Sequence, residues 1–160
     1  MSREILNATC TSLEKVVREF LQALDGIPDD DLNTWKPAAE HNGGGEMNTL
    51  AALSVHTTQA GAWRIVHQVF GHDYPRDRES EFTATASRVE IDTMFNTMLR
   101  RFAELIEQQP DVKLTAMPPT IRDSSPDWTR LQYLVSLVEH TALHLGHAQI
   151  TRQLWLAERG

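Results

Sequence analysis

Residues 131–151, LQYLVSLVEHTALHLGHAQIT, decide the fold class of this chain. Apart from histidine, the only formally charged side chain in the stretch is Glu139. At about 100° per residue on a helical wheel, the apolar residues gather on one side of a helix. We expect the following residues to form its core-facing side: Leu131, Leu134, Val135, Val138, Ala142 and Leu145. A helix with so few charges is expected to be largely buried.

Histidines occupy the opposite side of the same helix. His140 and His144 are four residues apart, so their rings lie one turn apart and can converge on one metal ion. The residues between them are Thr-Ala-Leu, so the HExxH zincin motif with its general base is absent. Spacing alone equally fits two structural histidines that are hydrogen-bonded across helices. His147, one turn further on, is interpreted as a second-shell donor or a hydrogen-bonded core residue.

Three further stretches show the same helical periodicity, and together they predict an all-α four-helix bundle. The expected helices cover residues 3–24, 49–70, 90–109 and 129–157. Gly26 and Pro28 end the first helix, while Asn48 is the expected N-cap and Gly71 the end of the second. The connections between consecutive helices are all long and rich in glycine, proline or polar residues. No strand pattern or domain boundary is visible, so residues 1–160 are predicted to form a single domain.

Composition narrows the classes of partner. The chain has 160 residues and a formal net charge of −7, so nucleic acid or an anionic membrane surface is not expected as a partner. Cys10 is the only cysteine, which excludes an intramolecular disulfide and a cysteine-based zinc site, and we interpret it as a small core residue. Neither a signal peptide nor a transmembrane segment is recognisable, so a cytoplasmic protein is expected.

A third metal ligand is expected from a facing helix, as is usual in helical bundles. The second helix offers His56 and His67, eleven residues apart and nearly on the same face. Three turns separate them by about 16 Å, so the two histidines cannot bind the same ion. The spacing does not decide which of them is the ligand.

Two motifs resemble a known family. The stretches LSVHTTQAGAW (53–63) and EHTALHLGHAQITRQL (139–154) are similar to the two signatures of the DinB/YfiT-like superfamily of metal-dependent enzymes. Residues 33–37 and 74–82 resemble its connecting segments, so the resemblance spans nearly the whole chain. It implies a DinB/YfiT-like bundle in which His56, His140 and His144 bind the metal. Many members carry glutamine at the position of His147, which is a departure from the family pattern.

Three neutral imidazoles would leave one divalent ion (zinc, nickel, manganese or iron) with open positions for water or a substrate heteroatom. Bound water would be activated for hydrolysis, or a bound thiol would be deprotonated. The resemblance implies a thiol S-transferase that acts on small electrophilic substrates with a low-molecular-weight thiol such as bacillithiol or mycothiol, and it suggests a homodimer.

The alternatives are a metal-dependent hydrolase and a non-catalytic helical binding or dimerisation module with structural histidines. No catalytic residue is assigned beyond the metal ligands. Candidates for the second shell or the pocket rim are His147, Tyr133, Trp63, Arg152 and Trp155.

Overall fold

The computed structural model describes residues 1–38, 47–119 and 127–159. These residues form helices, turns and loops without any strand, so the predicted all-α class is confirmed. In chain order the elements are α1 (Ser2–Ala23), α2 (Asp29–Thr34), α3 (Leu50–Trp63), the π-helical segment η2 (Arg64–Val69), the 3-10 turn η3 (Ser80–Phe82), α4 (Arg88–Gln108) and α5 (Arg130–Ala157). Within the described ranges, no helix combines the length and apolarity needed to cross a membrane.

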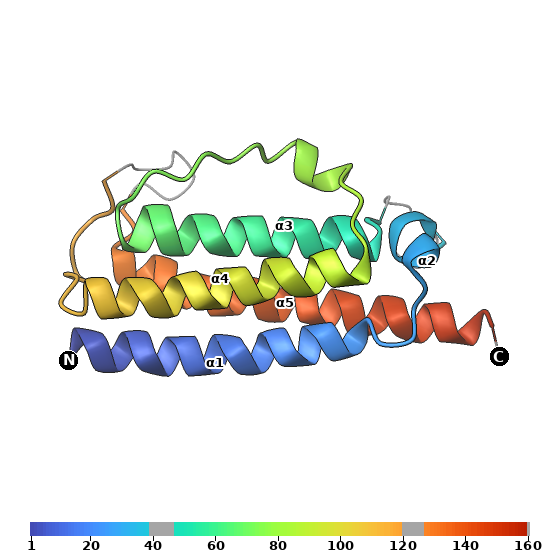
Figure 1. Cartoon of the computed structure of the whole chain (residues 1–160), viewed down its shortest axis with the longest axis horizontal. Coiled ribbons are helices and arrows are strands. Elements are labelled where there is room, and N and C mark those ends of the chain that lie inside the picture. Colours follow the sequence, from blue (N-terminus) through green and yellow to red (C-terminus); the bar gives the residue numbers. More distant parts are fainter. Residues whose placement is uncertain (39–46, 120–126, 160) are drawn as a thin grey trace.

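The four long helices lie alongside one another (Figure 1). Helix α1 packs against α4 and α5, and α3 packs against the same two helices, so α1 and α3 lie at opposite corners. Figure 1 shows α1 and α5 running in one direction and α3 and α4 in the other. Because α3 and α4 are parallel, the chain between them returns along the outside of α3. This is why a loop passes over the helix that carries His56.

Side-chain caps begin three of the long helices. The hydroxyl oxygens of Thr49, Ser87 and Thr129 each accept a hydrogen bond from a backbone N–H three residues further on. The predicted N-cap of the second long helix, Asn48, is therefore wrong by one residue. Gly71 follows the end of this helical stretch with a φ of +80°, a conformation that suits glycine, as the sequence predicted.

Two segments differ from the prediction. The first connection contains α2, which begins directly after Pro28 and places three aspartates in its first turn, where the helix dipole favours negative charge. The predicted helix 49–70 is not uniform, because η2 replaces its last turns by π-helix. The glycine-rich part of this first connection, at residues 43–45, lies outside the described residues.

The buried face of α5 also differs from the predicted one. Val135 is 61% exposed and Ala142 is exposed, although both were expected to face the core. The residues that are buried instead include hydroxyl side chains: Tyr133, Leu134, Ser136, Leu137, Thr141, Leu145, Ala148, Thr151 and Trp155. The Thr141 hydroxyl donates to the backbone carbonyl of Leu137 (2.8 Å), so it is satisfied inside the helix. A wheel that counted only apolar residues therefore placed the core face at the wrong angle.

Candidate metal centre

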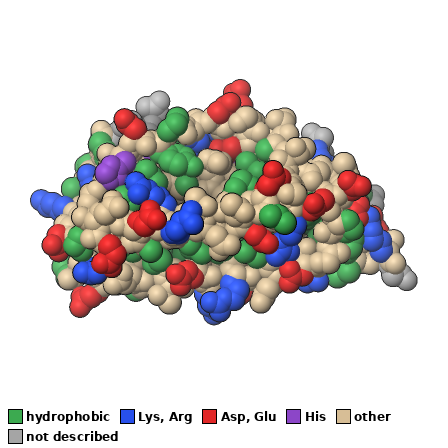
Figure 2. Space-filling model, in the orientation of Figure 1, with side chains coloured by type: hydrophobic (Ala, Val, Ile, Leu, Met, Phe, Trp, Pro, Cys, Tyr) green, Lys and Arg blue, Asp and Glu red, His purple; other side chains and the backbone are tan. Residues whose placement is uncertain are grey.

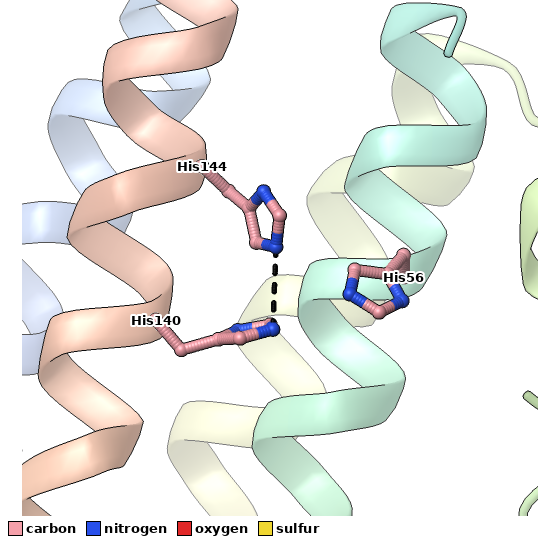
Figure 3. A group of neighbouring side chains, drawn as sticks. All are labelled: His56, His140 and His144. Carbon is pink, nitrogen blue, oxygen red and sulfur yellow. Dashed lines mark hydrogen bonds between the residues drawn. The ribbon is translucent and has the colours of Figure 1, made fainter. Parts of the chain in front are cut away.

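Three histidine side chains converge between α3 and α5. His56 comes from α3, and His140 and His144 come from consecutive turns of α5 (Figure 3). One ring nitrogen from each residue lies within 4.8 Å of the others. The predicted three residues are thus close enough to bind one metal ion. His67 is not part of this group, and its Nδ1 atom instead lies 2.9 Å from the backbone carbonyl oxygen of His72.

The spacing of the two α5 histidines fits a shared ion. Their Nε2 atoms are 3.2 Å apart, as the dashed line in Figure 3 marks. A tetrahedral ion with metal–nitrogen bonds of about 2.0–2.1 Å holds two ligand nitrogens about 3.3 Å from each other. Imidazole nitrogen is a donor that suits zinc, iron and nickel. Without a cation between them, one of the two nitrogens must carry a proton and donate it to the other.

A buried carboxylate orients His56. Glu81 in η3 is 2% exposed, and its Oε2 atom lies 2.8 Å from His56 Nδ1. The same carboxylate accepts two hydrogen bonds from the Arg76 guanidinium, at 2.6 and 2.7 Å. Since a carboxylate only accepts, His56 carries its proton on Nδ1, which leaves the Nε2 lone pair for a metal. In the described part of the chain, the Nδ1 atoms of His140 and His144 have no hydrogen-bond partner.

Glu81 and Arg76 were not among the residues predicted for the site. Both lie in the polar connection between α3 and α4, and Glu81 is 25 residues away from His56. No periodicity links a loop residue to a helix face at such a distance. A carboxylate near His56 could have been expected on chemical grounds only, because a metal-binding histidine commonly donates its second N–H to a carboxylate or a carbonyl.

Burial keeps the three imidazoles neutral. It lowers the pKa of His140 to about 2, with a further contribution from the Arg64 guanidinium. It lowers the pKa of His144 to about 4, where His56 and His147 add to the effect. Burial also lowers the pKa of His56, against the hydrogen bond to Glu81, which acts in the opposite direction. Near neutral pH all three rings therefore offer lone pairs rather than positive charges.

Three of the predicted neighbours belong to the two helices that carry the histidines. His147 is exposed, and its ring centroid is 5.5 Å from that of His144. Tyr133 is buried and packs edge-on against Trp63 with 6.2 Å between the ring centroids. Tyr133 is seven residues before His140, and Trp63 is seven residues after His56. Each aromatic ring is therefore attached about two turns, or about 11 Å, from the nearest histidine along its helix.

The remaining candidates lie away from the histidines. Arg152 donates to the backbone carbonyl of Asp25 (3.1 Å), and Trp155 donates to the Asp31 carboxylate (3.0 Å). Both contacts join α5 to the segment that follows α1. Cys10 is buried in α1, and burial raises the pKa of its thiol to about 11. This agrees with the predicted core position of Cys10.

Comparison with protein-family models and with curated protein sequences finds no match. Among solved structures, the chain is similar to a conserved protein from Enterococcus faecalis known from its crystal structure, with a TM-score of 0.60. The two chains are 18% identical over 94% of this chain and 96% of the other. At this identity the similarity shows a shared helical fold and no more.

Proposed function

We propose that this protein is a metal-dependent enzyme of the DinB/YfiT-like class, a four-helix bundle that binds one divalent ion through His56, His140 and His144. The observation that carries the proposal is the approach of three ring nitrogens, from two helices, to within 4.8 Å of one another. The motifs at residues 53–63 and 139–154 support the class, since both contain the converging histidines.

The reaction we propose is the transfer of a low-molecular-weight thiol to a small electrophilic substrate. An ion bound by three neutral imidazoles would supply positive charge that lowers the pKa of a bound thiol. In the reaction the thiol loses its proton, its sulfur bonds to an electrophilic carbon, and the bond from that carbon to its leaving group breaks. The only cysteine of the chain, Cys10, is buried with a raised pKa, so the thiol has to come from a cosubstrate.

One observation argues against hydrolysis that relies on a carboxylate as general base. Glu81, the carboxylate in contact with His56, is already bound by Arg76 and is 2% exposed. It is therefore engaged as an acceptor and is poorly placed to remove a proton from water as a general base. A metal-bound thiol needs no such base at the moment of attack, because it is already ionised, but a metal-bound hydroxide would be ionised in the same way, so the assay has to separate the two reactions.

The test is a conjugation assay with tag-free protein loaded with zinc, using several low-molecular-weight thiols and electrophiles such as an aryl halide. We expect conjugation that depends on the metal, is lost in His140→Ala, and is retained in His67→Ala, which removes a histidine outside the group. Ester hydrolysis without thiol, lost in the same variant, would support the hydrolase instead. Unchanged conjugation in His140→Ala would contradict both.

A further inference from the structure

A cavity lies between α3 and α4, away from the three histidines. It has a volume of about 220 Å³, and its walls come from α3, η2, α4 and Tyr74 in the loop that follows η2. It opens to solvent beside Thr93 and Thr97, which are both exposed. Figure 2, in which α4 lies nearest the viewer, shows hydrophobic side chains at the surface among charged ones. His56 instead points from α3 towards α5, so the cavity and the histidines lie on different sides of α3 (Figure 3).

Small residues on α3 make room for this cavity. Ala62 lines it, and at the preceding Gly61 an added Cβ would lie only 2.5 Å from the Met98 sulfur. Gly61 therefore allows Met98 to lie against α3, where it forms a buried part of the wall. On another side the Tyr74 hydroxyl donates to the side-chain oxygen of Gln59 (2.8 Å), which holds the Tyr74 ring in place. The cavity is thus preformed, and a ligand does not have to order the loop in order to bind.

The walls of the cavity favour an aromatic ring. Met94 and Met98 are four residues apart on α4, so their side chains lie on the same side of the cavity. Thioether sulfurs make favourable contacts with aromatic rings, and the Tyr74 ring is able to pack against another ring. An apolar cavity of about 150 Å³ holds benzene. A cavity of about 220 Å³ therefore has room for one ring with a short side chain.

A positive charge lies at one end of the cavity. Arg101 is the last residue of α4 in the cavity walls, and its Nη1 atom donates to Glu104 at 3.4 Å. Arg100 lies 3.9 Å from the other oxygen of the same carboxylate, so two arginines share one glutamate. Exposed pairs of this kind are weak, and a guanidinium has four further N–H donors beside the one that contacts Glu104. Arg101 is thus able to bind the carboxylate of a ligand that lies in the cavity.

We propose that this cavity is a second ligand site, which binds a small aromatic carboxylate. The ring lies against Met94 and Met98, and the carboxylate pairs with Arg101. The compound 3-phenylpropanoate, one ring with a carboxylate on a short chain, has this chemistry. The site goes beyond the proposed function and needs no metal ion, so the two proposals can fail separately.

The test titrates the full chain with 3-phenylpropanoate in the presence of a chelator, which keeps metal away from the histidines. The methionine methyl groups are isotope-labelled and observed by NMR, and of the five methionines Met94 and Met98 line the cavity. We expect saturable shifts of these two signals and little change in the others. The neutral 3-phenylpropanamide and the saturated 3-cyclohexylpropanoate should each bind about threefold more weakly or less tightly still.

Two pairs of variants test the assignment. Ala62→Leu fills the cavity and should lower the affinity about tenfold or more, whereas Ala142→Leu adds the same atoms at an exposed position and should leave it unchanged. Arg101→Gln should lower the affinity for the acid about threefold and leave that for the amide unchanged. Arg100→Gln is its control, because Arg100 contacts the same glutamate without lining the cavity.

The wild-type spectra test the site without any variant. No shift of the Met94 and Met98 signals, or equal shifts of all five methionines, would overturn the ligand site. Equal affinities in Ala62→Leu and Ala142→Leu would do the same. If the acid binds no more tightly than the amide or the saturated acid, or if Arg100→Gln weakens it as much as Arg101→Gln, the assigned class of ligand is wrong.

Discussion

Replacing Glu81 by glutamine tests how the loop between α3 and α4 supports the histidines. Glutamine has nearly the same shape as glutamate but no charge. In the structure the Glu81 carboxylate accepts from His56 Nδ1 at 2.8 Å and from two Arg76 nitrogens at 2.6 and 2.7 Å. The substitution should therefore loosen the orientation of His56 and leave the Arg76 guanidinium without its counter-charge.

Two separate magnitudes follow from these contacts. Loss of the partner that orients a metal-binding histidine costs about 10- to 100-fold in metal affinity, or about 1.4–2.7 kcal/mol. The side chains of Arg76 and Glu81 are 8% and 2% exposed, so the pair counts as buried. Breaking such a pair from one side costs about 3–5 kcal/mol of folding free energy. We expect the lower end of that range, since the amide oxygen of glutamine can still accept one hydrogen bond.

The assays are competition for Zn²⁺ with a chromophoric chelator and urea unfolding of the metal-free protein. Glu79→Gln is the control, because Glu79 lies two residues away in the same segment and is exposed. The double variant Arg76→Met/Glu81→Gln should recover much of the lost stability while zinc binding stays weak. If Glu81→Gln is folded and binds zinc as tightly as the wild type, Glu81 does not orient His56 and the reasoning is refuted.

Two further predictions concern stability. Thr129→Ala removes the side-chain cap of α5, and urea unfolding should show a loss of about 1 kcal/mol; an unchanged midpoint would mean that the cap contributes nothing. The metal-free protein should lose stability as the pH falls below about 6.5. In the folded protein the pKa values of His140 and His144 are about 2 and about 4, so below pH 6.5 these histidines bind protons in the unfolded chain but not in the folded one. Each of these two histidines lowers the free energy of unfolding by at most about 1.4 kcal/mol per pH unit, less any solvent screening. The contribution of His144 levels off below about pH 4. Urea unfolding across this range would contradict the account if His140→Ala/His144→Ala showed the wild-type slope.

Periodicity and spacing predicted the parts of the structure that depend on helices. The four long helices and the approach of His140 to His144 follow from residues that recur at helical intervals, whereas the choice of His56 over His67 rested on the resemblance of residues 53–63 to a family signature. The core face of α5 was misplaced because Thr141, with a hydroxyl satisfied by its own helix, packs like an apolar residue.

The contacts that support the three histidines could not be predicted from helical periodicity and spacing. Glu81 reaches His56 from a loop, and Arg64 reaches Ser136 across two helices, so neither contact has a local pattern in the sequence. The π-helical turns of η2 likewise have no signature in the spacing of apolar residues. These features depend on which elements pack together, and the structure is needed to see them.

The most direct test of the metal centre is the metal content of tag-free protein, measured by elemental analysis after incubation with excess divalent ions and desalting. The account predicts about one equivalent in the wild type and in His67→Ala, and none in His140→Ala, since the loss of one imidazole leaves two ligands. An absence of bound metal in the wild type, or the same content in His140→Ala, would contradict it. The three histidines would then have a structural role.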